Sequence, residues 1–265
     1  MMRCIVLTLF PEMVGPVLGQ SMLKRARDKG LLDVRLEHLR EHAIDRHKTA
    51  DDVPYGGGAG MVMKAEPILR AIEALKAAEQ RGSEPEARII LPSPQGRPFN
   101  HEDAVNLSKE RRPIIFLCGH YEGIDERVME LVEVEEMSLG DYVLTGGELA
   151  ALVMIDAAAR LIPGVLGDPT SASEESFTES LLEYPQYTRP ADVRGVSVPE
   201  VLLSGNHEAI RLWRRKESLR NTYRKRPDLL RDRPLNAEDT RLLNEVVHEC
   251  MTVISAPDAG GGVRV

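Results

Sequence analysis

The sequence predicts an α/β domain with a mostly parallel sheet, followed by a small helical domain. Strand-like and helix-like segments alternate from residue 3 to residue 137, which is typical of a parallel sheet with helical crossovers. Residues 139–164 then lead through Gly140, Gly146 and Gly147 into a helix over 148–160. That helix is apolar on most sides, so we expect it to be buried on most sides. From residue 166 the composition becomes polar, and only helical patterns follow it.

The first half of the expected domain contains two strands and two helices. An apolar run forms the first strand, and a helix follows that ends at Gly30, a residue suited to a helix C-terminus. An alternating second strand leads into a polar and then glycine-rich loop, after which a second helix ends at a polar loop. The expected strands are Arg3–Phe10 and Asp33–Leu39, the expected helices are 15–29 and Glu66–Gln80, and the loops are 42–63 and 82–86.

The second half repeats this alternation, and its strands end in glycine-bearing loops. The expected strands are Arg88–Leu91, Pro113–Cys118 and 132–137, and the helices are 101–110 and 124–131. Three loops stand out, namely 92–96, 119–123 and 139–147. Because ligands of open α/β sheets bind beyond the carboxyl ends of the strands, these loops predict one pocket rich in backbone amides and carbonyls.

The change of composition predicts the domain organisation. We expect a ligand-binding domain over 1–165, a mobile linker over 166–182, a helical domain over 183–255 and a disordered tail over 256–265. In the helical domain, Asn206 is suited to cap a helix that runs to about Arg224, and a second helix covers about 237–254.

Composition and charge limit the class of protein. The chain has 265 residues, 42% of them hydrophobic but only 4% aromatic, so its core must be aliphatic. Three cysteines without a CxxC pattern favour neither disulfides nor a zinc cluster. No segment predicts a signal peptide or a membrane span, and we therefore expect a cytoplasmic protein.

The net charge of −8 is unevenly distributed. Between Arg211 and Arg233 the chain has ten Lys or Arg and three Asp or Glu, a local charge of +7. Lys216, Arg220 and Arg224 recur every four residues, which places them in one stripe of a helix. Since few acids oppose this stripe in the sequence, we interpret it as a contact for nucleic-acid phosphates; a solvated helix face is the alternative.

Several short patterns are weak. His38 and His42 match the zinc pattern HxxEH, but His38 ends a strand, and two surface histidines explain the pattern better. Ser21 and Lys24 match SxxK without its partner motifs, and the sequon at Asn106 has no meaning in a cytoplasmic protein. The glycine-rich loop 56–60 is either a flexible loop or a binding loop whose neighbours Asp51, Asp52 and Tyr55 contact a ligand.

Long motifs in order resemble those of the bacterial tRNA (guanine37-N1)-methyltransferases, a family of SPOUT, or trefoil-knot, enzymes. The resemblance runs from residue 3 to about 230, and residues after about 250 are not covered. It rests on Leu9-Phe-Pro11, 51–63, Ser93-Pro-Gln-Gly96, Leu117-Cys-Gly-His-Tyr-Glu-Gly-Ile-Asp-Glu-Arg127, 140–148, Tyr187-Thr-Arg-Pro190 and 201–207.

The resemblance implies a deep trefoil knot in the parallel sheet, S-adenosyl-L-methionine as cofactor, and a homodimer with each active site at the interface. The alanine-rich face of helix 148–160 suits close helix contact in such a dimer. The polyanion is then tRNA containing G37 rather than DNA. By resemblance, the cofactor residues are Ser93, Gly119, Tyr121, Glu122, Leu139, Gly140, Asp141, Tyr142, Val143, Leu144, Gly146 and Gly147.

The chemistry requires a base for the proton on guanine N1 and a cation near O6, where negative charge develops. In the family, a linker aspartate and the arginine that ends the knot helix have these roles. Here the positions are Glu175 and Arg160, with Glu174 as the alternative base. Glutamate replaces the usual aspartate at 175, and also at 183, which lengthens both side chains. A pair with Asp156 is the structural alternative for Arg160.

We assign contacts with tRNA to residues of the glycine-rich loop, of the matched motifs and of the basic stripe. They are Asp51, Tyr55, Arg189, Asn206, His207, Arg214, Lys216, Arg220 and Arg224. The resemblance also suggests a contribution from Mg²⁺, although the sequence shows no convincing metal cage. The alternatives are a knotted methyltransferase for a ribose 2′-OH or another base, and a non-catalytic RNA-binding or cofactor-sensing protein.

Overall fold

The computed structural model describes residues 1–79, 86–167, 175–231 and 233–255. The chain forms two compact units, Met1–Ala172 and Ser173–Val265. The central part of the expected linker, residues 168–174, and the expected tail 256–265 lie outside the described residues.

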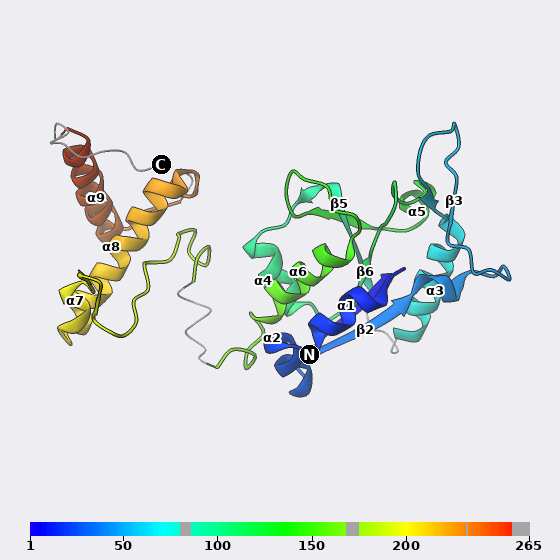
Figure 1. The fold of residues 1–265 in the computed structure, drawn as a ribbon, viewed down its shortest axis with the longest axis horizontal. Helices are drawn as coiled ribbons and strands as arrows, with labels where there is room; N and C mark the ends of the chain where they lie inside the picture. The colour runs from blue at the N-terminus through cyan, green and yellow to red at the C-terminus, as the bar shows by residue number, and fades with distance from the viewer. Residues whose placement is uncertain (80–85, 168–174, 232, 256–265) are drawn as a thin grey trace. The chain divides into compact units, whose positions relative to one another are not determined.

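The N-terminal unit is built on a five-stranded sheet whose neighbouring strands are all parallel, as predicted (Figure 1). Its strands are β1 (Met2–Thr8), β2 (Leu32–His38), β5 (Arg88–Pro98), β6 (Ile114–Leu117) and β7 (Glu135–Ser138), in the order β2-β1-β6-β5-β7. Every residue of β6 is buried, as are all residues of β1 except Arg3. Such continuous burial is expected of strands that are covered on both faces.

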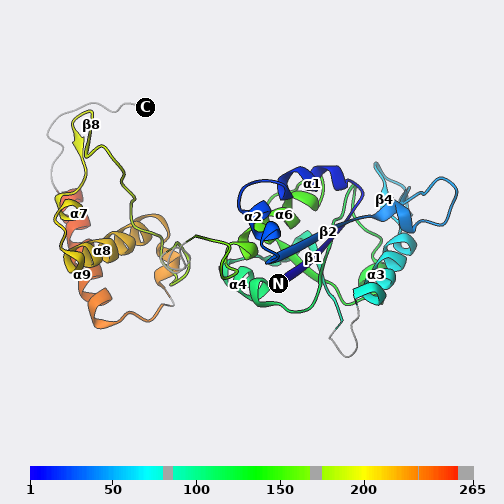
Figure 2. The same ribbon diagram turned by 90° about the horizontal axis from the view of Figure 1, so that it is seen from below.

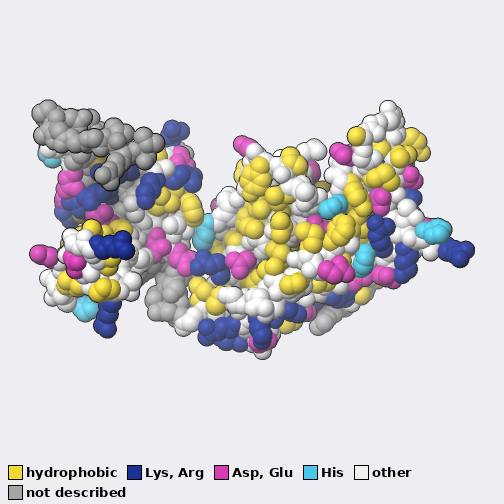
Figure 3. All heavy atoms as spheres, viewed as in Figure 1, with side chains coloured by type: hydrophobic (Ala, Val, Ile, Leu, Met, Phe, Trp, Pro, Cys, Tyr) yellow, Lys and Arg dark blue, Asp and Glu magenta, His cyan; other side chains and the backbone are white. Residues whose placement is uncertain are grey.

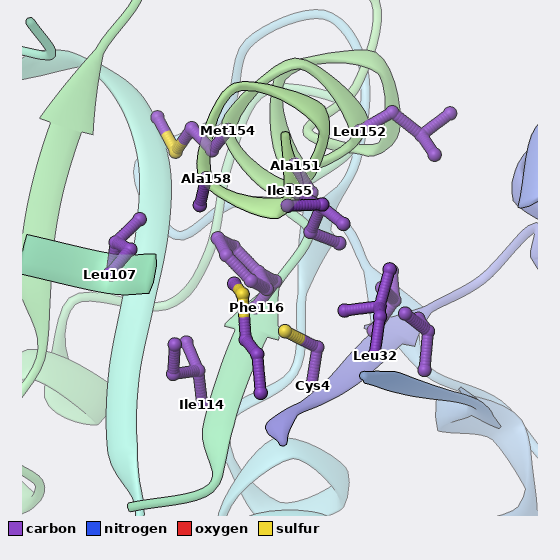
Figure 4. Packing of buried hydrophobic residues seen from close by; sticks show 14 of the residues in the cluster. Cys4, Leu32, Leu107, Ile114, Phe116, Ala151, Leu152, Met154, Ile155 and Ala158 are labelled. Atoms are coloured by element: carbon purple, nitrogen blue, oxygen red, sulfur yellow. The ribbon is translucent and has the colours of Figure 1, made fainter. Parts of the chain in front are cut away.

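Two groups of helices cover the two faces (Figure 2). One face packs against α1 (Pro11–Leu18), α2 (Ser21–Asp28), α4 (His101–Lys109) and α6 (Glu148–Ala159). The other packs against α3 (Ala65–Glu79), α5 (Arg127–Leu131) and the 3₁₀ turn η1 (Leu39–His42). Residues of β1 alternate between these layers, Cys4 and Val6 on one side and Ile5 and Leu7 on the other. Figure 4 shows Phe116 of β6 pointing toward α6.

The structure corrects two details of the expected elements. The single helix expected over 15–29 is two helices, because the chain turns after Leu18 and Ser21 adopts a left-handed φ of 47°. Strand β5 extends beyond Leu91 to Pro98, since Arg97 and Pro98 pair with β7 again after an irregularity. The expected end of a helix at Gly30 is confirmed by its φ of 65° and by the bond from Leu31 N–H to Ala26 O.

Helix α6 is buried on most sides, but not in the way that the dimer expectation required. Its alanines at 150, 151, 158 and 159 are buried within the unit. They therefore pack inside the chain and are not available to a second copy. The exposed apolar side chains of α6 are Leu149 and Val153, at 48% and 50% exposure.

The C-terminal unit is mostly helical, with α7 (Glu200–Leu203), α8 (His207–Lys225), the 3₁₀ turn η2 (Pro227–Leu230) and α9 (Ala237–Ser255). Leu181, Leu219 and Leu242 form its small core. The side chain of Asn206 accepts a bond from Ala209 N–H, which confirms the expected helix cap.

The unit is not purely helical, because β8 (Asp192–Val193) and β9 (Val196–Ser197) form a hairpin. The two residues between them, Arg194 and Gly195, have φ values of 56° and 81°. A tight turn of two such residues between strands is a known hairpin connection. The Arg-Gly pair between Val193 and Val196 is the sequence signal for this hairpin, which the prediction of a purely helical domain did not include.

Candidate functional site

A pocket of about 400 Å³ lies at the carboxyl ends of β5, β6 and β7. The three glycine-bearing loops 92–96, 119–123 and 139–147 all contribute to its wall, so the structure brings them together as predicted. A position beyond the carboxyl ends of parallel strands is where open α/β sheets bind ligands.

The structure places eleven of the twelve expected cofactor residues in this wall. They are Ser93, Gly119, Tyr121, Glu122, Leu139, Gly140, Tyr142, Val143, Leu144, Gly146 and Gly147. Asp141 is the exception, because it is exposed and does not line the pocket. The sequence interpretation did not select Gln95, His120, Glu126, Glu136 or Thr145, which also line it. His120 lies between selected residues, so adjacency within the loop was the available signal.

Backbone segments approach each other closely around the pocket. A Cβ atom added to Gly147 would lie 2.9 Å from Cys118 Cα, and the Gly147 N–H donates to Gly119 O at 2.8 Å. A Cβ atom on Gly96 would lie 2.4 Å from the backbone carbon of Glu136. No side chain fits at either position without a backbone shift, and this explains the use of glycine there.

The charge of the pocket wall is negative. Glu122, Glu126 and Glu136 line it, and none of the described Lys or Arg residues does. Tyr121, in the same wall, holds a left-handed φ of 59°, a conformation that costs energy in a non-glycine residue and is frequent at binding sites. The wall therefore combines backbone hydrogen-bonding groups with carboxylates, which suits a polar ligand that carries a positive charge.

The expected catalytic residues lie in different units. Arg160 is the C-cap residue of α6, where it is half-buried and its N–H bonds to Asp156 O at 3.2 Å. Glu175 belongs to the C-terminal unit, where it is half-buried and lines a second pocket of about 660 Å³ together with Glu183, His207 and Arg214. The alternative base, Glu174, lies outside the described residues.

The glycine-rich loop is an arm between two short strands, β3 (Asp51–Asp52) and β4 (Val62–Met63). Tyr55 in this arm is fully exposed, whereas Asp51 is mostly buried and pairs with Arg40 at 3.4 Å. The base of the arm is tied to the pocket loop, because Glu122 N–H donates to Met61 O and Met63 N–H donates to Gly123 O. Two backbone hydrogen bonds therefore join the base of the arm to a loop of the pocket wall.

The HxxEH pattern does not form a metal site. His38 Nδ1 accepts from Arg40 N–H, and His42 bonds to Glu37 at 2.9 Å. Among the described residues, no three His, Cys, Asp or Glu side chains come together as metal ligands would, and so the suggested Mg²⁺ receives no support from their arrangement. None of the described helices is long and apolar enough to span a membrane.

The premise of an unopposed basic stripe is wrong. Acids of α9 pair with it across the helix interface, since Lys216 Nζ lies 2.8 Å from both Glu245 and Glu249, and Arg220 pairs with Glu249. Arg220 also pairs with Glu217 of its own helix. The acids of α9 are about 30 residues away along the chain, so a count over 211–233 could not include them. Lys216 and Arg220 thus have partners before any phosphate arrives.

The same network continues at the start of α9. The Asp239 carboxylate is buried, and it receives bonds from Arg215 at 2.7 and 2.8 Å and from Arg233 at 3.1 Å. The hydrogen bonds from Arg215 outweigh burial and hold the pKa of Asp239 below its ordinary value. For Lys216, burial lowers the pKa, but the carboxylates of Glu245 and Glu249 raise it by more.

The remaining residues expected to contact tRNA differ in their surroundings. Arg189 and Arg224 are exposed, and no ion pair joins either to another described residue. Arg214 packs over the ring of Tyr184 at 4.8 Å. His207 is exposed, and Asn206 uses its side-chain oxygen as a helix cap.

Comparisons with known proteins agree on one family. Residues 2–232 match the family model described as tRNA (Guanine-1)-methyltransferase TrmD. The chain is 55% identical over 245 residues to a protein of Geobacter metallireducens, covering 92% of this chain and 98% of that protein. It is 56% identical over 242 residues to one of Carboxydothermus hydrogenoformans, covering 91% and 92%. Both relatives are named tRNA (guanine-N(1)-)-methyltransferase.

Proposed function

The chain belongs to the tRNA (guanine-1)-methyltransferase family, and on this premise we propose that it methylates N1 of G37 in tRNA with S-adenosyl-L-methionine. The observation that carries the proposal is the acidic pocket at the carboxyl ends of β5 to β7. Family membership gives the reaction class, and this pocket gives the chain a place for the methyl donor. Because the substrate is tRNA, we expect the enzyme to work in the cytoplasm.

The pocket residues fit this donor. When bound, it supplies a methyl group on a positively charged sulfur, and Glu122, Glu126 and Glu136 favour a cation in the wall. The loops at Gly119 and Gly140–Gly147 offer backbone groups of the kind that hydrogen-bond the edge of a purine. The set of eleven wall residues named above is our proposal for the cofactor contacts.

Glu175 is the proposed base, and Arg160 the proposed cation. N1 of guanine carries a proton, which Glu175 accepts as the new N–CH₃ bond forms. The charge that develops toward O6 is stabilised by the guanidinium of Arg160. When bound, the donor would supply the methyl group and leave as S-adenosylhomocysteine, so protons and charge balance.

The contacts with tRNA are proposed on both units. Tyr55 is fully exposed on its arm, and Arg189, His207 and Arg224 are exposed on the C-terminal unit. Lys216 and Arg220 contribute less to phosphate binding than their number in the sequence implies, because a phosphate must compete with Glu245 and Glu249.

A homodimer is proposed from the apolar surface of the N-terminal unit. Leu149 and Val153 of α6 are exposed at helical spacing, as are Met13 and Val17 of the neighbouring α1. Figure 3, viewed as Figure 1, shows hydrophobic side chains gathered on one face of this unit. A Val153→Glu variant should sediment as a monomer and lose methyl transfer. A dimer that persists in this variant contradicts the proposed interface.

The trefoil knot of the SPOUT class is also part of the proposal. The backbone contacts of Gly96 with residues 136–137, and of Gly147 with residues 118–119, support it. Close backbone contacts of this kind are compatible with a chain that passes tightly between neighbouring loops.

The decisive experiment compares Glu175→Ala, Glu175→Asp and Glu183→Gln in methyl transfer to tRNA transcripts with G37 or with A37. Glu175→Ala should lower kcat by about 10²- to 10⁴-fold, the usual contribution of a general base, with unchanged affinity for S-adenosylhomocysteine. Glu175→Asp, which restores the usual family residue, should retain activity. If Glu175→Ala is fully active and Glu174→Ala is inactive, the base is Glu174.

The same assay tests the competing functions. Methylation that persists on the A37 transcript, or that maps to a ribose 2′-OH, points to a different knotted methyltransferase. Binding of tRNA and cofactor without any methyl transfer by the wild-type chain points to a non-catalytic protein.

A further inference from the structure

A fully buried carboxylate lies beside the cofactor pocket, and the proposed mechanism gives it no role. Glu148, the first residue of α6, has no exposed surface. Its Oε1 accepts a short bond of 2.5 Å from Thr8 Oγ1, and Thr8 in turn accepts from Phe10 N–H at 2.8 Å. Its Oε2 is buried, and no described residue hydrogen-bonds to it. A buried carboxylate oxygen without a partner is costly, and so it calls for an explanation.

The Nδ1 atom of His120 is in the same situation. It is buried without a hydrogen-bond partner among the described residues. The two atoms border the same small space, because a Cβ atom added to Gly146 would lie 2.3 Å from Glu148 Oε2 and 2.6 Å from His120 Nδ1. An unpartnered acceptor thus lies beside a nitrogen that can carry a proton.

The surroundings hold both side chains in place. The His120 ring packs on Phe10, with centroids 4.6 Å apart, and contacts Tyr121 edge-on at 4.9 Å. The backbone N–H of His120 donates to Met63 Sδ at 3.1 Å, and His120 and Gly146 form a backbone bridge. Burial and the negative charge of Glu148 raise the pKa of the nearby Cys118 thiol, which keeps this sulfur neutral.

We propose that Glu148 and His120 form a buried carboxylate–imidazole pair that joins the loop 119–123 to the start of α6 beside the cofactor pocket. In the described structure neither Glu148 Oε2 nor His120 Nδ1 has a hydrogen-bond partner; in the proposed pair, Oε2 accepts from His120 Nδ1–H, as Oε1 accepts from Thr8. Glu148 is then a positioning residue. It fixes the proton of His120 on Nδ1 and leaves Nε2 as the free nitrogen of a ring that helps to line the pocket.

The pair has a consequence for the cofactor loops. Gly146 and Gly147 line the pocket, and Gly147 N–H already bonds to Gly119 O. A second, charge-assisted bond one residue further along both loops fixes their separation. This consequence rests on the proposed use of the pocket for S-adenosyl-L-methionine, whereas the pair itself does not.

The tautomer of His120 tests the pair without any ligand. The full chain is labelled with ¹⁵N-histidine, and His120→Gln identifies the signal of His120 among the seven histidines. In the wild type at neutral pH, we expect the proton on Nδ1. In Glu148→Gln, whose amide can donate, we expect the proton to move to Nε2. A wild-type proton on Nε2, or a signal that Glu148→Gln does not change, overturns the proposal.

A second pair of variants separates positioning from loss of stability. Thr8 and Thr222 are both fully buried, and each accepts a backbone N–H at 2.8 Å, but Thr222 lies in the C-terminal unit. Thr8→Val should weaken binding of S-adenosylhomocysteine about tenfold, the effect of one lost charge-assisted bond, while Thr222→Val leaves it unchanged.

Thr8→Ser should restore the affinity. Equal affinities of Thr8→Val and the wild type contradict the positioning role. If the wild type itself does not bind S-adenosylhomocysteine, the proposed function fails, while the tautomer experiment still decides the pair.

Discussion

The two units of this protein handle polar groups in opposite ways. The N-terminal unit lines its pocket with backbone groups, glycines and carboxylates, and none of the described Lys or Arg residues joins that wall. The C-terminal unit has a small core and connects α8 to α9 through ion pairs, several of them around the buried Asp239. Carboxylates thus line an open pocket in one unit, whereas in the other they pair with Arg and Lys and hold two helices together.

The largest effect, a loss of stability of the C-terminal unit, should come from Asp239→Asn. The substitution leaves Arg215 and Arg233 without a buried partner, and breaking such a pair costs about 3–5 kcal/mol. Trp213, the only tryptophan of the chain, lies on α8, so its fluorescence reports unfolding of the C-terminal unit. Asp228→Asn, in an exposed pair with Arg226, is the control and should cost under about 0.5 kcal/mol. If Asp239→Asn and Asp228→Asn have the same free energy of unfolding, the buried ion pairs do not stabilise the C-terminal unit as proposed.

A smaller effect should come from Gly147→Ala. The added Cβ would lie 2.9 Å from Cys118 Cα, and overpacking of this kind costs about 1–3 kcal/mol. Affinity for S-adenosylhomocysteine should fall with stability, as measured by calorimetry and thermal unfolding. Gly167→Ala, at a position where a Cβ meets nothing within 4 Å, is the matched control. Undiminished affinity in Gly147→Ala would show that the close approach does not shape the pocket.

Acid should destabilise the C-terminal unit through the same carboxylates. The folded state lowers the pKa of Asp239, through its bonds from Arg215, and of Glu249, through its bond from Lys216. Their stabilisation is fully present above the unfolded values, near pH 4, and is lost as pH falls through the folded values. Unfolding followed by Trp213 should therefore become easier below about pH 4. Asp239→Asn should flatten this dependence, and an unchanged pH profile contradicts the assignment.

The smallest effect concerns the proposed contact of α8 with tRNA. Arg224→Gln should weaken binding a few-fold and lower the slope of affinity against salt concentration by about 1, as loss of one phosphate contact does. Lys216→Gln should change the affinity and its salt slope less, because Lys216 already pairs with Glu245 and Glu249. A larger salt effect for Lys216→Gln than for Arg224→Gln indicates that tRNA displaces these acids.

The fold of the N-terminal unit was largely predictable. The buried strands β1 and β6 are continuous apolar runs, and the helix at 148 has few polar residues. The break at Ser21 and the extension of β5 were missed, since a left-handed residue and a second pairing with β7 leave little trace in hydrophobicity. The pocket loops at 119–123 and 139–147 were predictable because each follows its strand directly, whereas the segment 92–96 forms the irregular part of β5. The outward position of Asp141 was not predictable.

The sequence alone determined the family, the parallel sheet and the three loops that meet at its edge, because these features depend on local patterns and on long motifs. Which charges remain available and which surfaces remain exposed depends on tertiary packing. This packing gave Lys216 and Arg220 partners from α9, buried the alanines of α6, and placed Glu148 beside His120. These outcomes depend on residues far apart in the chain, whose proximity is created by packing and not by spacing along the sequence.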